Sequence, residues 1–411
     1  MWTNLFHAML THFVRIGDLH VTLPDGTIRQ YGDGTRPFAA IHIKDPSLLR
    51  RIVMNPDLGV GEGYMEGTLT IDDEDLYGFL ELAVRNAARP SAFVWWQQPL
   101  RLMRRALRVV EQYNPIERAP ANVAHHYDLS GELYDLFLDA DLQYSCAYFR
   151  KPSETLEQAQ DNKKRHIASK LLIEPGMRVL DIGCGWGGLA LTLASEYGAH
   201  VLGVTLSKEQ HEVACQRARA AGLQDQVEFR LMDYRAVEGE FDRIVSVGMF
   251  EHVGVPHYRE FFDQVHHLLK PDGVALIHTI GRSSPPGTTS SFIAKYIFPG
   301  GYVPALSETM RAIEHQDLCT TDIEVWRLHY AETLKHWRAR FEANIDKVRD
   351  IYDERFCRMW RYYLIAAELT FRHDHQVVFQ FQLTHRQDAV PLTRDYLYQP
   401  EKPRRLRQAA E

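Results

Sequence analysis

The stretch Val179-Leu-Asp-Ile-Gly-Cys-Gly-Trp-Gly-Gly188 determines the predicted fold class. It places a Gly-x-Gly-x-Gly loop between an apolar strand over residues 178–182 and a helix over residues 187–197. Glycines in this position allow a tight turn and let the backbone approach a ligand at the carboxyl end of the strand. The loop therefore predicts a cofactor site, although dinucleotide enzymes share such loops and an ordinary strand–helix turn is the alternative.

Three details favour S-adenosylmethionine over a dinucleotide as the cofactor. The third glycine, Gly187, follows without the two-residue gap of the dinucleotide fingerprint. Asp181 lies just before the loop, where its carboxylate could order the turn or orient the amino group of the ligand. Lys270-Pro-Asp-Gly273 precedes a late strand, as is usual in this class of methyltransferases.

Strand and helix patterns alternate on both sides of this loop. We expect further strands at residues 200–204, 227–231, 241–247 and 274–280, with helices at 207–222 and 258–269 between them. A strand at Asp322–His329, two long helices and a strand at Gln376–Leu383 follow an insertion over residues 281–320. Such alternation predicts an α/β protein with a doubly wound parallel sheet, the Rossmann-like fold of class I methyltransferases.

The chain divides into four predicted regions. Residues 1–88 form a small α+β domain, with a hairpin at Pro24-Asp-Gly26 and no catalytic constellation. Residues 89–123 form a connector, residues 124–390 the catalytic domain, and residues 391–411 a basic tail. In the connector, Trp95-Trp96 precede four arginines that share one helical face: Arg101, Arg104, Arg105 and Arg108. This pattern suits an anionic membrane surface, and a docked helix with solvated arginines is the alternative.

Composition excludes several classes of protein. A net charge of −7 argues against a general nucleic-acid binder. The five cysteines are widely spaced and form no Cys-x-x-Cys pair, so neither a disulfide framework nor a metal site is expected, and a cytoplasmic location fits. The N-terminus lacks the pattern of a signal peptide, and no apolar run reaches the ~20 residues of a membrane span.

The second predicted strand departs from the common pattern of such cofactor sites. It ends in Val204-Thr-Leu-Ser207, without the acidic residue that often holds the ribose hydroxyls. Gln210, in the next helical turn, could replace that residue, and Ser207 and Gln210 have the spacing of a capping box. Tyr234 follows the third strand, where an adenine would be flanked, and a surface aromatic is the alternative.

The chain resembles the cyclopropane-fatty-acyl-phospholipid synthase family, which includes mycolic-acid cyclopropane synthases. The resemblance covers nearly the whole chain and is strongest between His125 and Leu383. It rests on motifs that occur in the same order: His126-Tyr-Asp-Leu129, Tyr144-Ser-Cys-Ala-Tyr-Phe149, Gly183-Cys-Gly-Trp-Gly-Gly188, Gly203-Val-Thr-Leu-Ser207, Phe250-Glu-His-Val-Gly254, His278-Thr-Ile280 and Tyr296-Ile-Phe-Pro-Gly-Gly301.

The resemblance implies a reaction and a set of site residues. The family transfers a methylene group from S-adenosylmethionine to the double bond of unsaturated phospholipid acyl chains, with bound bicarbonate as the base. Its motif positions place bicarbonate at Cys146, Glu251, His278, Ile280 and Tyr330. They place the cofactor at Tyr127, Tyr144, Ser145, Asp181, Gly183, Gly185, Gly187, Thr205, Leu206, Ser207, Gln210 and Tyr234. The implied setting is the inner face of the membrane, with a homodimer as an open alternative.

Each of these residues also has a structural alternative. Glu251 could cap a helix, His278 could be a satisfied core histidine, and Tyr330 could be an ordinary aromatic at a helix start. The chain also carries Ala367 where several family members have a cysteine. A methyl-branched or methylene-branched product, methylation of a small amine, and a non-catalytic lipid-binding relative remain alternatives. Four aromatics of the insertion are candidates for lining an apolar pocket: Phe292, Tyr296, Phe298 and Tyr302.

Overall fold

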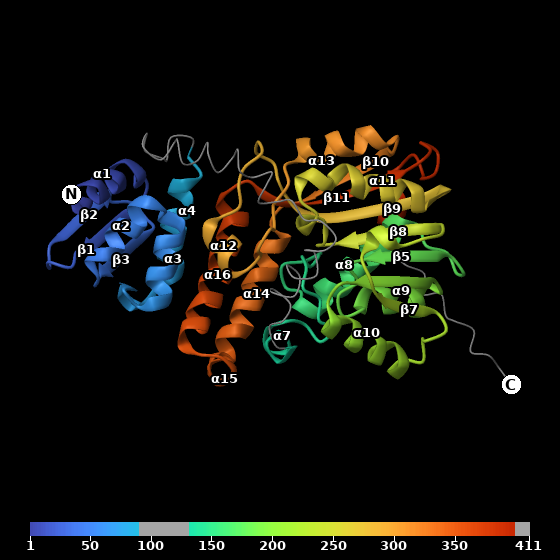
Figure 1. Ribbon diagram of the computed structural model, residues 1–411, viewed down its shortest axis with the longest axis horizontal. Coiled ribbons are helices and arrows are strands. Elements are labelled where there is room, and N and C mark those ends of the chain that lie inside the picture. Colours follow the sequence, from blue (N-terminus) through green and yellow to red (C-terminus); the bar gives the residue numbers. More distant parts are fainter. Residues whose placement is uncertain (90–130, 399–411) are drawn as a thin grey trace.

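The computed structural model describes residues 1–89 and 131–398, and its larger part is built on a seven-stranded sheet (Figure 1). The strand order is β10 (Cys319–Trp326), β11 (Gln376–Thr384), β9 (Leu269–Arg282), β8 (Phe241–Val247), β5 (Arg178–Ile182), β6 (His200–Thr205) and β7 (Val227–Leu231). The pairs among β9, β8, β5, β6 and β7 are parallel. The carboxyl ends of β5, β6 and β8 therefore meet at one edge, where ligands collect in such sheets.

Helices cover both faces of this sheet. One face carries α8 (Leu156–Leu171), α9 (Gly188–Tyr197) and α10 (Lys208–Ala220), and the other carries α11 (Tyr258–Leu268) and α13 (Leu306–Ile313). Successive strand residues point to opposite faces, so Val179 packs in one buried cluster and Leu180 in the other. The predicted α/β fold class, a sheet with helices on both faces, is thus confirmed.

A four-stranded sheet forms the N-terminal part of the chain. Its order is β2 (Ile28–Gly32), β1 (Asp18–Thr22), β3 (Phe38–Ile43) and β4 (Leu69–Ile71). The helices of this part are α1 (Trp2–Phe13), α2 (Pro46–Met54), α3 (Pro56–Glu66) and α4 (Leu76–Ala87). The predicted hairpin is present, because β1 and β2 pair antiparallel and the amide of Leu23 donates to the carbonyl of Thr27 at 2.8 Å.

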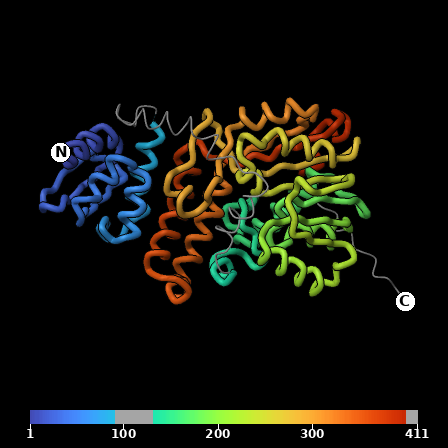
Figure 2. Tube along the Cα trace, in the orientation of Figure 1, coloured from blue at the N-terminus to red at the C-terminus, as the bar shows by residue number. Residues whose placement is uncertain are grey.

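A layer of helices lies between the two sheets, as Figures 1 and 2 show. It comprises α12 (Ser291–Tyr296), α14 (His329–Ala343), α15 (Ile345–Ile351) and α16 (Glu354–His373), next to α7 (Gly131–Phe137). Polar contacts join α3 to this layer: Asp57 accepts from the amide of Phe292 at 3.1 Å, and Glu62 accepts from Lys295 at 2.6 Å. One buried apolar cluster runs from α1 through to α16, so the N-terminal part shares a core with the catalytic part.

The remaining elements are single 3-10 turns. They are η1 (Asp72–Glu74), η3 (Tyr234–Ala236), η4 (Phe250–His252), η5 (Val255–His257), η6 (Glu314–Gln316) and η7 (Arg394–Leu397). In the part of the chain that the structure describes, no helix has both the length and the apolar character needed to cross a bilayer.

Three sequence-based expectations differ from the structure. The sheet is not wholly parallel, because β11 runs antiparallel to both β9 and β10. The strand expected at 322–329 is β10, which ends at Trp326, and His329 already opens α14. Residues 270–273 do not separate a helix from a strand; they lie within β9, in an irregularity of its pairing with β8.

Some predictions fall outside the described residues. The basic face of Arg101, Arg104, Arg105 and Arg108 lies there, as do Tyr127 and most of the tail. The boundary at residue 123 lies there too, and the division of the chain at residues 88, 123 and 390 stays a prediction.

Candidate active site

The glycine loop forms the floor of a pocket at the carboxyl edge of the sheet. Gly183, Gly185 and Gly187 have φ values of 79°, 55° and 84°, in the left-handed region that side chains other than glycine rarely adopt. The amides of Gly183 and Cys184 both donate to the carbonyl of Val204, at 2.9 and 3.0 Å. These two hydrogen bonds therefore hold the turn against the end of β6.

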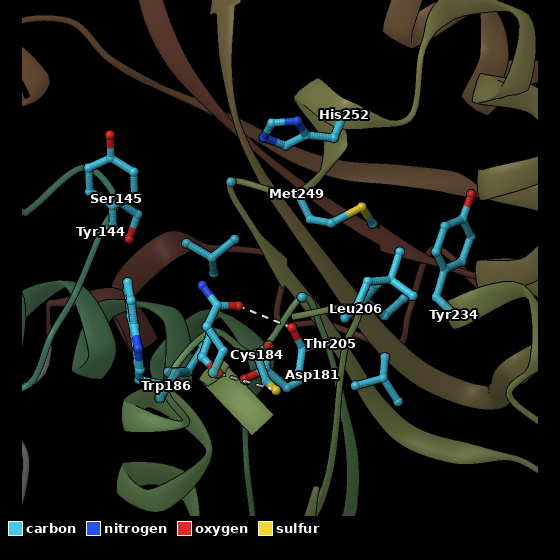
Figure 3. Close-up of a pocket in the computed structure, with 18 of the residues that line it drawn as sticks. Tyr144, Ser145, Asp181, Cys184, Trp186, Thr205, Leu206, Tyr234, Met249 and His252 are labelled. Carbon is cyan, nitrogen blue, oxygen red and sulfur yellow. Dashed lines mark hydrogen bonds between the residues drawn. The ribbon is translucent and has the colours of Figure 1, made fainter. Parts of the chain in front are cut away.

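Most of the predicted cofactor residues line this pocket (Figure 3). Figure 3 shows Tyr144 and Ser145 on one side and Tyr234 on the other, so the pocket extends across the end of the sheet. The lining includes nine of the twelve predicted residues: Tyr144, Ser145, Asp181, Gly183, Gly185, Thr205, Leu206, Gln210 and Tyr234. Gly187 and Ser207 are not part of the lining and are the N-cap residues of α9 and α10 respectively.

Gln210 takes a role that differs from the predicted one in part. Ser207 caps α10 by accepting from the amide of Gln210 at 3.3 Å, as expected. The Gln210 side chain does not close a capping box; its Oε1 accepts from the Thr205 hydroxyl at 3.1 Å. This bond leaves the side-chain nitrogen Nε2 of Gln210 as a donor at the pocket wall. It also orders the Thr205 side chain.

Asp181 is a buried carboxylate facing the pocket. Its side chain is 2% exposed, and its Oδ2 atom has no hydrogen-bond partner. Burial raises its pKa to about 7, an effect that the nearby ammonium of Lys163 only partly offsets. An unpartnered carboxylate in such a place is complementary to a cationic group of a ligand.

The raised pKa of Asp181 leads to a testable prediction for the ligand-free protein. The unfolded carboxyl has a pKa near 3.8 and the folded one near 7, so the folded state holds the proton more tightly between these values. The contribution of Asp181 to stability is complete below about pH 3.8 and is lost as the pH rises to about 7. We expect Asp181→Asn to gain melting temperature relative to the wild type across this interval, in thermal scans at pH 4 to 8. A difference in melting temperature between the variant and the wild type that stays constant with pH would contradict the burial argument.

Two of the five predicted bicarbonate residues, Glu251 and Ile280, lie near the carboxyl ends of β8 and β9. Glu251, in η4, follows β8, and its Oε1 accepts from the amide of Ile280 at 2.6 Å. Its Oε2 is buried and has no hydrogen-bond partner, and burial raises the pKa of this carboxyl to about 7. The structure therefore brings Glu251 and Ile280 into direct contact and leaves one buried carboxylate oxygen without a hydrogen-bond partner.

His278 is a neutral imidazole in the core of the sheet. It is 2% exposed, and burial holds its pKa well below the usual value. Its Nδ1 lies 3.0 Å from Nε2 of Gln380 on β11, and its ring packs edge-on against Trp326. With the amide in this orientation, Gln380 donates to Nδ1, so the proton of the imidazole is on Nε2. His278 therefore has a donor in Nε2.

Cys146 and Tyr330 are buried among other neighbours. The Cys146 thiol donates to the carbonyl of Ala147, and burial raises its pKa, so it is not a thiolate. Tyr330, near the start of α14, packs against Trp337 and Phe371. Cys146 thus offers backbone groups rather than a nucleophilic sulfur.

Of the four aromatics expected to line an apolar pocket, Phe298 places its ring against a residue of the cofactor pocket. Its ring centroid lies 5.7 Å from that of His252, which lines the pocket, and 6.0 Å from that of Tyr363. The other three pack elsewhere: Phe292 against Tyr362, Tyr296 on Glu62, and Tyr302 on Glu308. Phe292 and Tyr296 join the insertion to α16 and α3. Tyr302 bonds Glu308 within the insertion, and its backbone amide donates to the carbonyl of Glu251 at 2.9 Å.

A sequence profile of the family described as mycolic acid cyclopropane synthetase matches residues 115–381, more than half of the chain. The chain belongs to this family. A second profile, described only as a domain of unknown function, matches residues 5–90.

Curated relatives agree with this membership in the cyclopropane synthetase family. The cyclopropane-fatty-acyl-phospholipid synthase of Escherichia coli strain K12 is 40% identical over 340 residues, which are 83% of this chain and 86% of that protein. A probable fatty acid methyltransferase of Pseudomonas putida is 35% identical over 398 residues, which are 92% of this chain and 96% of that protein.

A solved structure of the family points to the cofactor. The mycolic acid cyclopropane synthase CmaA1, complexed with SAH and CTAB, superposes with a TM-score of 0.61 at 35% identity. The match covers 64% of this chain and 97% of that one. Family and fold together make this chain a methyltransferase that uses S-adenosylmethionine.

Several pocket residues of this cyclopropane synthetase family member were not predicted from its sequence. Lys163, Trp186, Met249 and His252 line the pocket, and burial lowers the pKa of His252 to about 4. Trp186 and His252 stand inside quoted motifs, so their positions could have signalled them. Lys163 lies on α8, ahead of the first strand, where the sequence carries no signal of a ligand.

Proposed function

We propose that this protein transfers a methylene group from S-adenosylmethionine to the double bond of an unsaturated phospholipid acyl chain, forming a cyclopropane ring. Bound bicarbonate is the base in this proposal, and Glu251 and His278 hold it. The observation that carries the proposal is the unpartnered, buried Oε2 of Glu251 at the end of β8, beside the cofactor pocket.

The donor set fits bicarbonate. This ion carries one hydroxyl that can donate and oxygens that can accept, so it suits a site with both an acceptor and a donor. Glu251 offers the acceptor through Oε2, and His278 offers the donor through Nε2. Burial of both side chains keeps water from competing for these groups.

The cofactor supplies a methyl group on a sulfonium, which the weakly nucleophilic alkene attacks. The residues of the chain contribute alignment, exclusion of water and stabilisation of positive charge. Tyr144 lines the pocket, stacks on Trp337 and shares a hydrogen bond of 3.1 Å with Tyr363. Ring faces of this kind stabilise a nearby cation by about 0.5–2 kcal/mol each. Transfer of the proton from the new methyl group to the base then allows the ring to close.

The setting we propose is the inner face of an anionic membrane, where phospholipid acyl chains are found. The four arginines at 101, 104, 105 and 108, which the sequence predicts to share one helical face, support this location, because clustered arginines are attracted to anionic headgroups. A homodimer organised by the N-terminal part remains an alternative within the proposal.

Purified enzyme, labelled S-adenosylmethionine and vesicles of a defined unsaturated phospholipid test the proposal. We expect label in cyclopropane chains by mass spectrometry, and slower ring formation when bicarbonate is removed from the buffer. Full activity in carbonate-free buffer would contradict bicarbonate as the base.

A methyl-branched product is the second candidate. It is favoured by the likeness to the Pseudomonas putida protein, which is described as a probable fatty acid methyltransferase. In the same assay it would give labelled chains with a branch and no ring. Absence of S-adenosylhomocysteine release would instead identify a lipid-binding relative without turnover.

A further inference from the structure

Lys163 places a buried ammonium in the lining of the cofactor pocket. The residue is 1% exposed on α8, and its Nζ donates to Gln143 Oε1 at 2.7 Å and to Ser145 Oγ at 2.8 Å. Both acceptors also line the pocket. Removing an ammonium from water is costly unless an anion or several acceptors replace the water.

The two other buried lysines of α8 are in a different situation. Lys164 pairs with Asp141 at 2.7 Å, and Lys170 pairs with Glu324 at 2.5 Å. Both hydrogen-bond partners of Lys163 are neutral, and the carboxylates of Asp139 and Asp141 act on its charge only through space. An ammonium has three N–H donors. Burial lowers the pKa of Lys163 to about 8, so the side chain is still mostly charged at neutral pH.

Ser145 extends this donor group toward the ligand. Its Oγ accepts from Lys163, so its own hydrogen is directed to another acceptor. Lys163 and Ser145 therefore offer donors in the lining that also contains the unpartnered carboxylate of Asp181. A ligand end with one carboxylate and one ammonium complements this arrangement.

We propose that Lys163 binds the carboxylate of the amino-acid end of S-adenosylmethionine, directly and through Ser145, while Asp181 receives its ammonium group. The proposal rests on the cofactor of the proposed function and not on its lipid substrate. It makes Lys163 a residue that selects cofactors retaining the carboxylate.

The test compares S-adenosylhomocysteine with its decarboxylated analogue, which keeps the amine. In the wild type we expect calorimetry to show about 10- to 100-fold tighter binding of S-adenosylhomocysteine, the range for hydrogen bonds to charged groups. Lys163→Met should weaken the binding of S-adenosylhomocysteine by about that factor. It should change the affinity for the analogue by less than about threefold. Lys164→Met is the matched control, because Asp141 keeps its pair with Arg217 and the preference should persist.

The wild-type protein provides an independent measurement that does not depend on the folding of a variant. Binding of a carboxylate raises the pKa of Lys163 above its ligand-free value near 8. The protein should therefore take up about half a proton when it binds S-adenosylhomocysteine at pH 8. Titrations in two buffers of different ionisation enthalpy measure this uptake, and the analogue should show much less. The proposal would be overturned by equal proton uptake on binding of the two ligands, or by equal losses of affinity for both ligands in Lys163→Met. Neither outcome would alter the lipid products that test the proposed function.

Discussion

Glu251→Gln is expected to reduce turnover by about 10²- to 10⁴-fold, the usual contribution of a positioned acid or base. Affinity for S-adenosylhomocysteine should stay within about twofold, because Glu251 is not among the residues lining the cofactor pocket. Glutamine can still accept from the amide of Ile280 through its oxygen. It replaces the unpartnered Oε2 with an NH₂ group, which can neither carry negative charge nor accept from bicarbonate.

Single-turnover kinetics and calorimetry on the same variant separate the two effects. Glu368→Gln is a suitable control, since Glu368 is another buried glutamate but bonds Arg338 and Arg372 within the helical layer. Its main effect should be a lower melting temperature, with a much smaller loss of turnover than Glu251→Gln shows. If Glu251→Gln lost cofactor affinity and turnover equally, Glu251 would not have the role of holding the base.

Gly187→Ala is expected to lower the free energy of unfolding by about 2–4 kcal/mol, from left-handed backbone strain together with overpacking. Gly187 has a φ of 84°, and a Cβ atom there would lie 2.5 Å from the Phe229 ring and 3.1 Å from Cβ of Ala214. Both neighbours belong to buried elements, so neither can move freely. Chemical denaturation measures the loss.

Two glycines with left-handed φ values separate the contributions. Gly176 has a φ of 85° and nothing within 4 Å of its Cβ position, so Gly176→Ala should cost only the backbone strain of about 1–2 kcal/mol. Gly185 also has nothing within 4 Å of its Cβ position, but it lines the pocket. Gly185→Ala should therefore lower stability by a similar amount and also weaken cofactor binding. Equal stability of the Gly176 and Gly187 variants would contradict the packing argument.

Local signals explain why much of the fold could be predicted. Apolar strands, capping residues and the glycine loop between 178 and 188 each act over a few residues, and β5, β6, β7 and β8 lie within one residue of their predicted positions. The antiparallel direction of β11 had no such signal. It depends on how the chain returns after α14 and α16, which is a long-range choice.

The same distinction between local signals and long-range packing applies to the candidate site. The sequence by itself predicted the cofactor loop and Asp181 from their place at the end of a strand, and its resemblance to the family implied the pair of Glu251 and His278. Only the tertiary structure decided that Lys163 faces the same pocket and that Phe292 packs away from it. The physical reason is that a side chain's neighbours depend on how separate elements pack, and burial then sets the charge state of groups such as Asp181.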